Sequence, residues 1–178
     1  MPVSASTRQG WPSLPAAGPE GEIMPGNDSI ISQLNVRLAE ELTAISQYIV
    51  HAEMCKSWHY RKLHEVIFKR SIEEMKHAEK LIARILALKG VPRIDQIGTI
   101  AIGSEIQKIH LHDHAVEAAA INGYNESIRL AQVAGDSVTR ELLEAILVDE
   151  EEHIDCIEAQ MDQIAETGMQ NYLREQLG

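Results

Sequence analysis

The sequence has few cysteines and no long hydrophobic run. Its 178 residues include only two cysteines, Cys55 and Cys156, and they lack the close spacing of a metal-binding pair. Two cysteines are also too few for a disulfide scaffold. No run approaches the 18 apolar residues of a membrane-spanning helix, and the first 25 positions lack the apolar stretch of a secretory signal. We therefore expect a protein that neither spans nor binds a membrane and resides in the cytoplasm.

Positive charge is also scarce. The chain has 16 Lys and Arg against 27 Asp and Glu, which gives a formal net charge of −11. Binding to phosphate backbones without regard to sequence needs the opposite sign, so no nucleic acid is expected as a partner. In contrast, 44% of the residues are hydrophobic and 24% are charged, as is usual for a globular protein. A chain of this length is long enough for one domain with a real core.

Proline is nearly absent after the first 26 residues. Five of the six prolines and four of the 11 glycines lie before residue 27, and such a composition does not bury enough apolar surface to offset the entropy of ordering. Residues 1–26 are therefore predicted to form a flexible tail. Residues 27–178 contain only Pro92 and are rich in Glu, Ala, Leu, Ile and Lys, which favours long helices in a single domain.

Capping residues divide this domain into four long helices over about 27–58, 60–89, 104–134 and 137–168, followed by a short helical stretch over 169–177. Ser104 and Gln107 form a capping-box pattern, and Gly90 and Pro92 mark a helix end. Helices of about 30 residues are about 45 Å long. The link over 91–104 can extend to about 46 Å, so it can run the length of the bundle. The prediction is an all-α four-helix bundle with one long crossover connection and a short fifth C-terminal helix.

Ionisable residues interrupt the apolar stripe of every long helix. Residues spaced alternately by four and three positions share one face of a helix, and this spacing places Glu41, Arg70 and Glu117 among inward-facing positions. Unpaired buried charges cost several kcal/mol each. Two divalent metal ions would balance the four inward carboxylates, with two neutral imidazoles completing the ligand set. The inward carboxylates and imidazoles are Glu41, Glu74, His77, Glu117, Glu150 and His153.

These residues form an internal duplication. Glu41 and Glu74 are 33 residues apart, and so are Glu117 and Glu150; a histidine follows three residues after the second Glu of each pair. The two halves repeat at an offset of 76 residues, which also relates Tyr48 to Tyr124. One Glu from each of two helices and a Glu-x-x-His from each of the other two is the pattern of ferritin-like di-iron proteins.

The segments EELTAISQY, SIEEMKHAE, DEEEHID and TGMQNYLREQ resemble bacterioferritin, and the resemblance covers about residues 27–177. It implies a ferritin-like di-iron domain that assembles, through dimers, into a hollow shell of twenty-four identical subunits. The activity implied is a ferroxidase, which oxidises Fe(II) with O2 or H2O2 and stores a ferric mineral in the shell. It also implies haem b at two-fold interfaces, which assists iron release, and a small ferredoxin as the reductant.

The resemblance also implies roles for individual residues. Glu74 and Glu150 are expected to bridge the two irons, and Tyr48 to hydrogen-bond a ligand carboxylate. Met75 lies on a second apolar stripe of its helix, and the resemblance implies that one Met75 from each of two subunits ligates the haem iron. The six residues expected to bind the irons are Glu41, Glu74, His77, Glu117, Glu150 and His153.

The sequence departs from the family at Lys69 and Arg70, where many bacterioferritins have His-Glu. These two cations put an auxiliary iron site or an acidic iron path in doubt there, and Arg70 could instead pair with a ligand carboxylate. Three alternatives stay open at this point: a rubrerythrin-like di-iron peroxidase, a miniature ferritin that shields DNA, and a haem-carrying electron-transfer or structural shell without storage. A rubrerythrin-like peroxidase would carry a cysteine-rich module, which two isolated cysteines cannot form. A miniature ferritin usually places its ligands across a subunit interface, whereas here all six are expected within one bundle.

Overall fold

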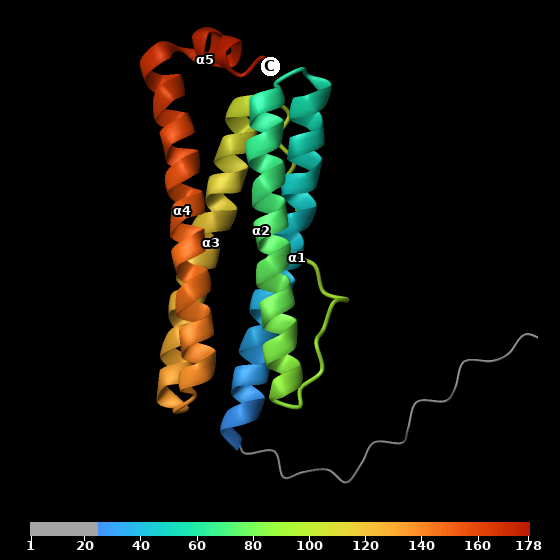
Figure 1. Ribbon diagram of the computed structural model, residues 1–178, viewed down its shortest axis with the longest axis vertical. Coiled ribbons are helices and arrows are strands. Elements are labelled where there is room, and N and C mark those ends of the chain that lie inside the picture. Colours follow the sequence, from blue (N-terminus) through green and yellow to red (C-terminus); the bar gives the residue numbers. More distant parts are fainter. Residues whose placement is uncertain (1–24) are drawn as a thin grey trace, which may run out of the picture.

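The computed structural model describes residues 25–178, which contain five helices joined by three short turns and one long crossover (Figure 1). This confirms the prediction of an all-α protein with four long helices and a short fifth one. The predicted tail falls, except for its last two residues, outside the described residues. The helices are α1 (Pro25–Ser57), α2 (Arg61–Ala87), α3 (Ile106–Val133), α4 (Ser137–Thr167) and α5 (Met169–Glu175).

The helix ends lie within a few residues of the predicted ones. α1 begins at Pro25, since a proline suits a first turn, where its missing N–H needs no partner. The predicted capping box at α3 is wrong. Glu105 is the N-cap residue and no side chain caps the helix; the Ser104 hydroxyl instead accepts a hydrogen bond from Lys108. At α4 the Asp136 side chain does accept a hydrogen bond, from the Thr139 N–H.

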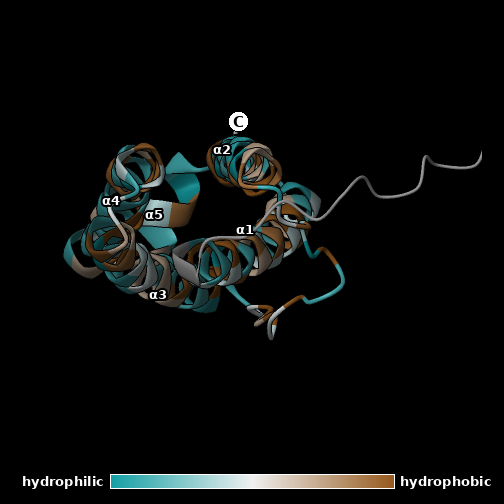
Figure 2. Ribbon diagram, turned by 90° about the horizontal axis from the view of Figure 1, so that it is seen from below, coloured by the Kyte–Doolittle hydropathy of each residue, from teal (hydrophilic) through white to brown (hydrophobic). Residues whose placement is uncertain are grey.

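The helices form two antiparallel pairs, α1 with α2 and α3 with α4. The crossover over residues 88–105 returns along the bundle, so α2 and α3 run parallel, as its length predicts (Figure 1). Viewed nearly end-on, the four long helices surround a common centre, and α5 crosses one end (Figure 2). α1 packs against α3 and α2 faces α4. All four long helices can therefore direct side chains into one interior.

Two apolar clusters fill this interior and leave a polar layer between them. On α1, Leu38 belongs to one cluster and Ala44 to the other, and Glu41 lies between them. On α2, Ile67 and Ala78 are divided in the same way by Glu74. The interruptions seen in the sequence therefore meet at one level of the bundle.

A polar stripe on α1 holds the crossover in place. One acceptor atom per turn or two of α1 receives a backbone N–H of the crossover, which satisfies donors that an irregular segment would otherwise leave unpaired. The Nε2 atom of His51 accepts from Gly103 at 2.9 Å. The other pairs are Arg93 to Asn35, Gly98 to Thr43 and Ala101 to Gln47. None of the helices in the described part of the chain is long and apolar enough to cross a membrane.

Candidate metal centre

The polar layer brings together all six residues that the sequence singled out as metal ligands. None of them is more than 8% exposed. Their donor atoms form two groups, and the atoms of each group lie within 4.8 Å of one another. The first group is Glu41, Glu74, His77 and Glu150, and the second is Glu74, Glu117, Glu150 and His153.

Glu74 and Glu150 belong to both groups and lie at the centre. The Nδ1 atom of His77 is 3.1 Å from Glu74 and 3.2 Å from Glu150, and that of His153 is 2.9 Å and 3.2 Å from the same two carboxylates. One oxygen of each central carboxylate is buried, and a histidine Nδ1 atom lies 2.9 Å from that of Glu74 and 3.2 Å from that of Glu150. Buried carboxylate oxygens and imidazole nitrogens that converge in this way are an arrangement that a cation satisfies.

The outer nitrogen of each histidine contacts a carboxylate on the opposite helix. His77 Nε2 lies 2.9 Å from Asp149, and His153 Nε2 lies 3.3 Å from Glu73. A donor bond at Nε2 fixes the ring and turns Nδ1 toward the centre, as is usual for metal-binding histidines. Sequence reasoning missed Glu73 and Asp149. They are themselves 76 residues apart, so the duplication was the signal that could have found them.

Two tyrosines complete the duplication. The Tyr48 hydroxyl donates a hydrogen bond to Glu117 at 2.5 Å, and the Tyr124 hydroxyl donates one to Glu41. Each tyrosine therefore orients the outer carboxylate of the other half. Tyr48 was expected in this role, whereas Tyr124 was noted only as its counterpart in the repeat.

Several groups of the site favour bound protons when no metal is present. Burial, together with the neighbouring central carboxylates, raises the pKa of Glu41 and of Glu117 well above the usual value. Burial alone would lower the pKa of His153, but its hydrogen bonds to Glu150 and Glu74 outweigh this and raise the pKa to about 10. Burial would raise the pKa of Glu74, but hydrogen bonds from His153 and His77 lower it to about 2. Metal ions must therefore displace protons to bind.

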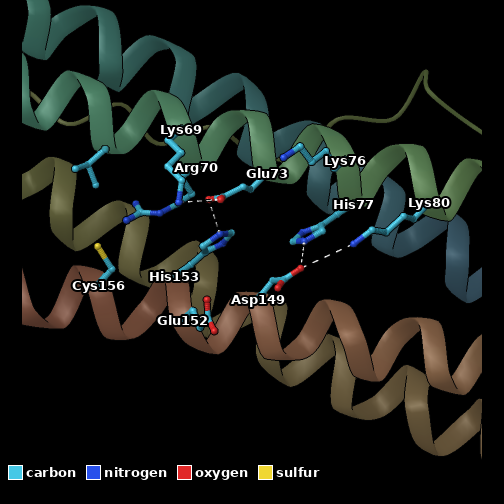
Figure 3. Close-up of a pocket in the computed structure, with 11 residues that line it drawn as sticks. Lys69, Arg70, Glu73, Lys76, His77, Lys80, Asp149, Glu152, His153 and Cys156 are labelled. Carbon is cyan, nitrogen blue, oxygen red and sulfur yellow. Dashed lines mark hydrogen bonds and ion pairs between the residues drawn. The ribbon is translucent and has the colours of Figure 1, made fainter.

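Two cavities reach this centre from opposite sides. One of about 160 Å³ opens between α1 and α3, and its wall includes Glu41 and Glu117. The other, of about 410 Å³, opens between α2 and α4 and reaches His77 and His153 (Figure 3). The buried centre is therefore accessible without unfolding of a helix.

Met75 lies away from the centre. Its side chain is 52% exposed on α2, although it follows the buried Glu74 directly. Phe68 and Leu86, on the same stripe, are exposed as well. The structure thus places Met75 on an outward apolar surface, apart from the six buried residues.

Comparison with known proteins gives the family. Residues 31–167 match the ferritin-like domain. A bacterioferritin of Brucella melitensis is 36% identical over 149 residues, which cover 84% of this chain and 92% of that protein. The chain belongs to the bacterioferritin family. Bacterioferritin BfrA of Mycobacterium tuberculosis is 36% identical over 84% of this chain and 94% of its own. A bacterioferritin of Streptomyces coelicolor is 37% identical over 84% of this chain and 90% of its own.

Membership in the bacterioferritin family and the buried carboxylate and imidazole cluster point to the same chemistry. Carboxylate oxygens and imidazole nitrogens suit iron. A ferritin-like iron protein with a buried site for two metal ions accounts for both observations.

Proposed function

We propose that the chain is a ferroxidase that oxidises Fe(II) to Fe(III) and stores the product as a ferric mineral. The observation that carries this proposal is the sharing of Glu74 and Glu150 between two four-residue groups. Shared carboxylates hold two metal ions close together, so two electrons are available to one molecule of oxidant, O2 or H2O2.

Charge supports two ions rather than one. Four carboxylates carry four negative charges when ionised, and two Fe(II) ions carry four positive ones. In the proposed loaded state both histidines are neutral and bind through Nδ1, with their Nε2 protons held by Asp149 and Glu73. The imidazoles therefore complete the ligand set without adding charge.

Side chains of this chain release protons as metal binds and hold the ligand carboxylates in place. Glu41 and Glu117 give up protons as Fe(II) binds, and the Tyr48 and Tyr124 hydroxyls then hold the two carboxylates in place. The cavity between α1 and α3, with its acidic wall, is the proposed entry for Fe(II). The bound iron supplies the electrons that reduce the oxidant.

The wider function follows the relatives. We propose a hollow, cytoplasmic shell of twenty-four subunits built from dimers, with haem b between pairs of Met75 side chains and a small ferredoxin as reductant for iron release. Met75 suits this role since its thioether is exposed within an apolar surface, where a second copy can cover it.

Iron oxidation by single-residue variants tests the ferroxidase proposal. Fe(II) is added anaerobically, then O2, and ferric absorbance and iron retention are followed. We expect Glu74→Ala and Glu150→Ala to lose about 10²-fold or more in rate, as expected when an electrostatic contribution of several kcal/mol is removed. Glu65→Ala, at an exposed position of the same helix as Glu74, is the control. Variants of Glu74 and Glu150 that oxidise iron as fast as the parent would contradict the assignment.

A further inference from the structure

The cavity between α2 and α4 is rich in basic side chains, in contrast to the acidic wall of the cavity on the other side of the bundle. Three of its bases, Lys69, Lys76 and Lys80, are exposed on α2, and the fourth, Arg70, is buried (Figure 3). The metal site does not use these four side chains as ligands. They therefore need a separate explanation.

Arg70 is the strongest indication of a ligand. It is 5% exposed, yet its guanidinium makes no hydrogen bond to any residue in the described part of the chain. Its nearest carboxylate oxygens are 3.8 Å away on Glu117 and 3.9 Å away on Asp113, too far for a hydrogen bond. None of its nitrogens is both fully buried and without a partner, so the guanidinium reaches the cavity that it lines, where an added acceptor can meet it.

Asp113 does not serve as that acceptor in this geometry. Its Oδ1 atom already accepts hydrogen bonds from Gln47 at 2.9 Å and from His51 at 2.7 Å, and its Oδ2 atom accepts none. The Arg70 guanidinium also stacks over the Tyr48 ring, 5.5 Å from its centroid. This contact helps to hold the guanidinium beside the cavity.

The carboxylates of the cavity are mostly engaged. Glu73 contacts Lys69 at 3.0 Å and also His153. Asp149 contacts His77 at 2.9 Å and Lys80 at 3.9 Å. Among the described residues, Lys76 has no ion-pair partner, and Glu152 is the one lining carboxylate without one. Arg70 and Lys76 are thus the basic groups best placed to receive an added anion.

We propose that this cavity binds a tetrahedral oxyanion, inorganic phosphate, at the buried Arg70, with the exposed Lys76 farther along α2 adding positive charge. A guanidinium presents a planar set of donors that matches two phosphate oxygens at once, whereas a lysine acts as a point charge. The site goes beyond the proposed ferroxidase function and does not depend on it. Phosphate held by Arg70 would lie beside Glu117 and so next to the metal centre.

Phosphate binding to the assembled, chelator-treated protein tests the proposal by isothermal titration calorimetry at low ionic strength. We expect one phosphate per subunit, and about a tenfold or larger loss of affinity in Arg70→Met, as loss of a charge-assisted bidentate contact implies. Arg37→Met is the matched control. Arg37 is equally buried and lies over Tyr124, but it does not line this cavity.

Lys76→Gln provides a second test in case Arg70→Met fails to fold, because Lys76 is exposed and its substitution should leave the fold intact. We expect it to weaken phosphate binding several-fold, while Lys108→Gln, which lies outside the cavity, leaves it unchanged. Absence of phosphate binding by the parent, or unchanged affinity in both Arg70→Met and Lys76→Gln, would overturn the proposal and leave Arg70 as a structural partner of Asp113. The titration contains no iron, so its outcome is separate from that of the ferroxidase assay.

Discussion

Each outer carboxylate of the metal centre is held by a tyrosine from the other half of the molecule. Tyr48 donates to Glu117 and Tyr124 donates to Glu41. Both hydroxyls are fully buried, so removing one leaves a carboxylate oxygen without its donor and free to turn. The two hydroxyls should therefore act on different metal ions.

Tyr48→Phe and Tyr124→Phe are expected to weaken binding of one metal ion each, by about 10- to 100-fold, as for other residues that orient metal ligands. Co(II) titration followed by visible absorbance resolves the two binding steps. Tyr172→Phe is the control, since it also removes a buried hydroxyl but one that hydrogen-bonds to His110 and Gln160, outside the metal centre. Equal affinities for all three variants would contradict a positioning role.

The titrating groups of the centre predict how pH affects the metal-free protein. The pKa of His153 is raised from 6.5 to about 10 by its hydrogen bonds to Glu150 and Glu74, despite burial. The folded state thus binds more protons than the unfolded state between these values. This contribution to stability is complete below pH 6.5 and is lost as the pH rises toward 10. The raised pKa values of Glu41 and Glu117 act in the same direction.

We therefore expect the Tm of the metal-free protein to fall between pH 6.5 and 9.5. Zn(II) should reverse this trend, since metal binding competes with protons and strengthens over the same range. Differential scanning calorimetry with and without Zn(II) measures both curves. Parallel curves, or a metal-free Tm that rises with pH, would show that protons do not neutralise the site.

Spacing alone was enough to place the six buried residues, because a helix repeats every 3.6 residues and four helices share one interior. It was not enough for Glu73 or Asp149. These side chains are partly exposed and look in sequence like any solvated acid. Their role depends on which helix faces which, and that is a tertiary property.

At the scale of elements, one property of the crossover could be predicted from the sequence and another could not. Its length predicts that it spans the bundle, and it does. Its attachment to α1 was not predicted. His51 carries no sequence pattern, yet it accepts from Gly103 and donates to Asp113, which joins the crossover, α1 and α3. Polar residues on one face of a helix look solvent-facing in sequence until the chain that covers them is placed.

His51→Leu should destabilise the metal-free protein by about 2 kcal/mol, because it leaves the buried Gly103 N–H unpaired and removes a donor from Asp113. Asn35→Ala removes the acceptor of the exposed Arg93 N–H. It should lower the free energy of unfolding by less than about 1 kcal/mol, because water can replace the lost hydrogen bond. Chemical denaturation gives both values. Hydrogen exchange should also show faster exchange at Gly103 in His51→Leu only, and equal effects of the two substitutions would argue against a special role for His51.

At the scale of the whole molecule, two helical hairpins with the same ligand spacing face each other across the metal centre. Every contact described above between a ligand and its supporting residue crosses from one hairpin to the other: Asp149 to His77, Glu73 to His153, and each tyrosine to the opposite Glu. Neither hairpin alone can build the centre. Its formation therefore requires the complete bundle.

The outward face of α2 is where the proposed shell would bring in a second copy of the chain. Met75, Phe68 and Leu86 are exposed there, and an apolar stripe of this kind on a single chain marks an interaction surface.

Since a weak thioether ligand favours reduced haem iron, Met75→Leu should remove the haem Soret band and slow iron release. Its apolar surface is kept, so assembly should continue at about 475 kDa, the mass of twenty-four chains of 19.8 kDa. Size-exclusion chromatography with absorbance detection measures both properties together, and Met161→Leu, at a partly buried position on α4, is the matched control. A Soret band that survives in Met75→Leu, or a parent particle of dimer size, would contradict the haem-bearing shell, whereas loss of the band with an intact particle would place the haem at this surface.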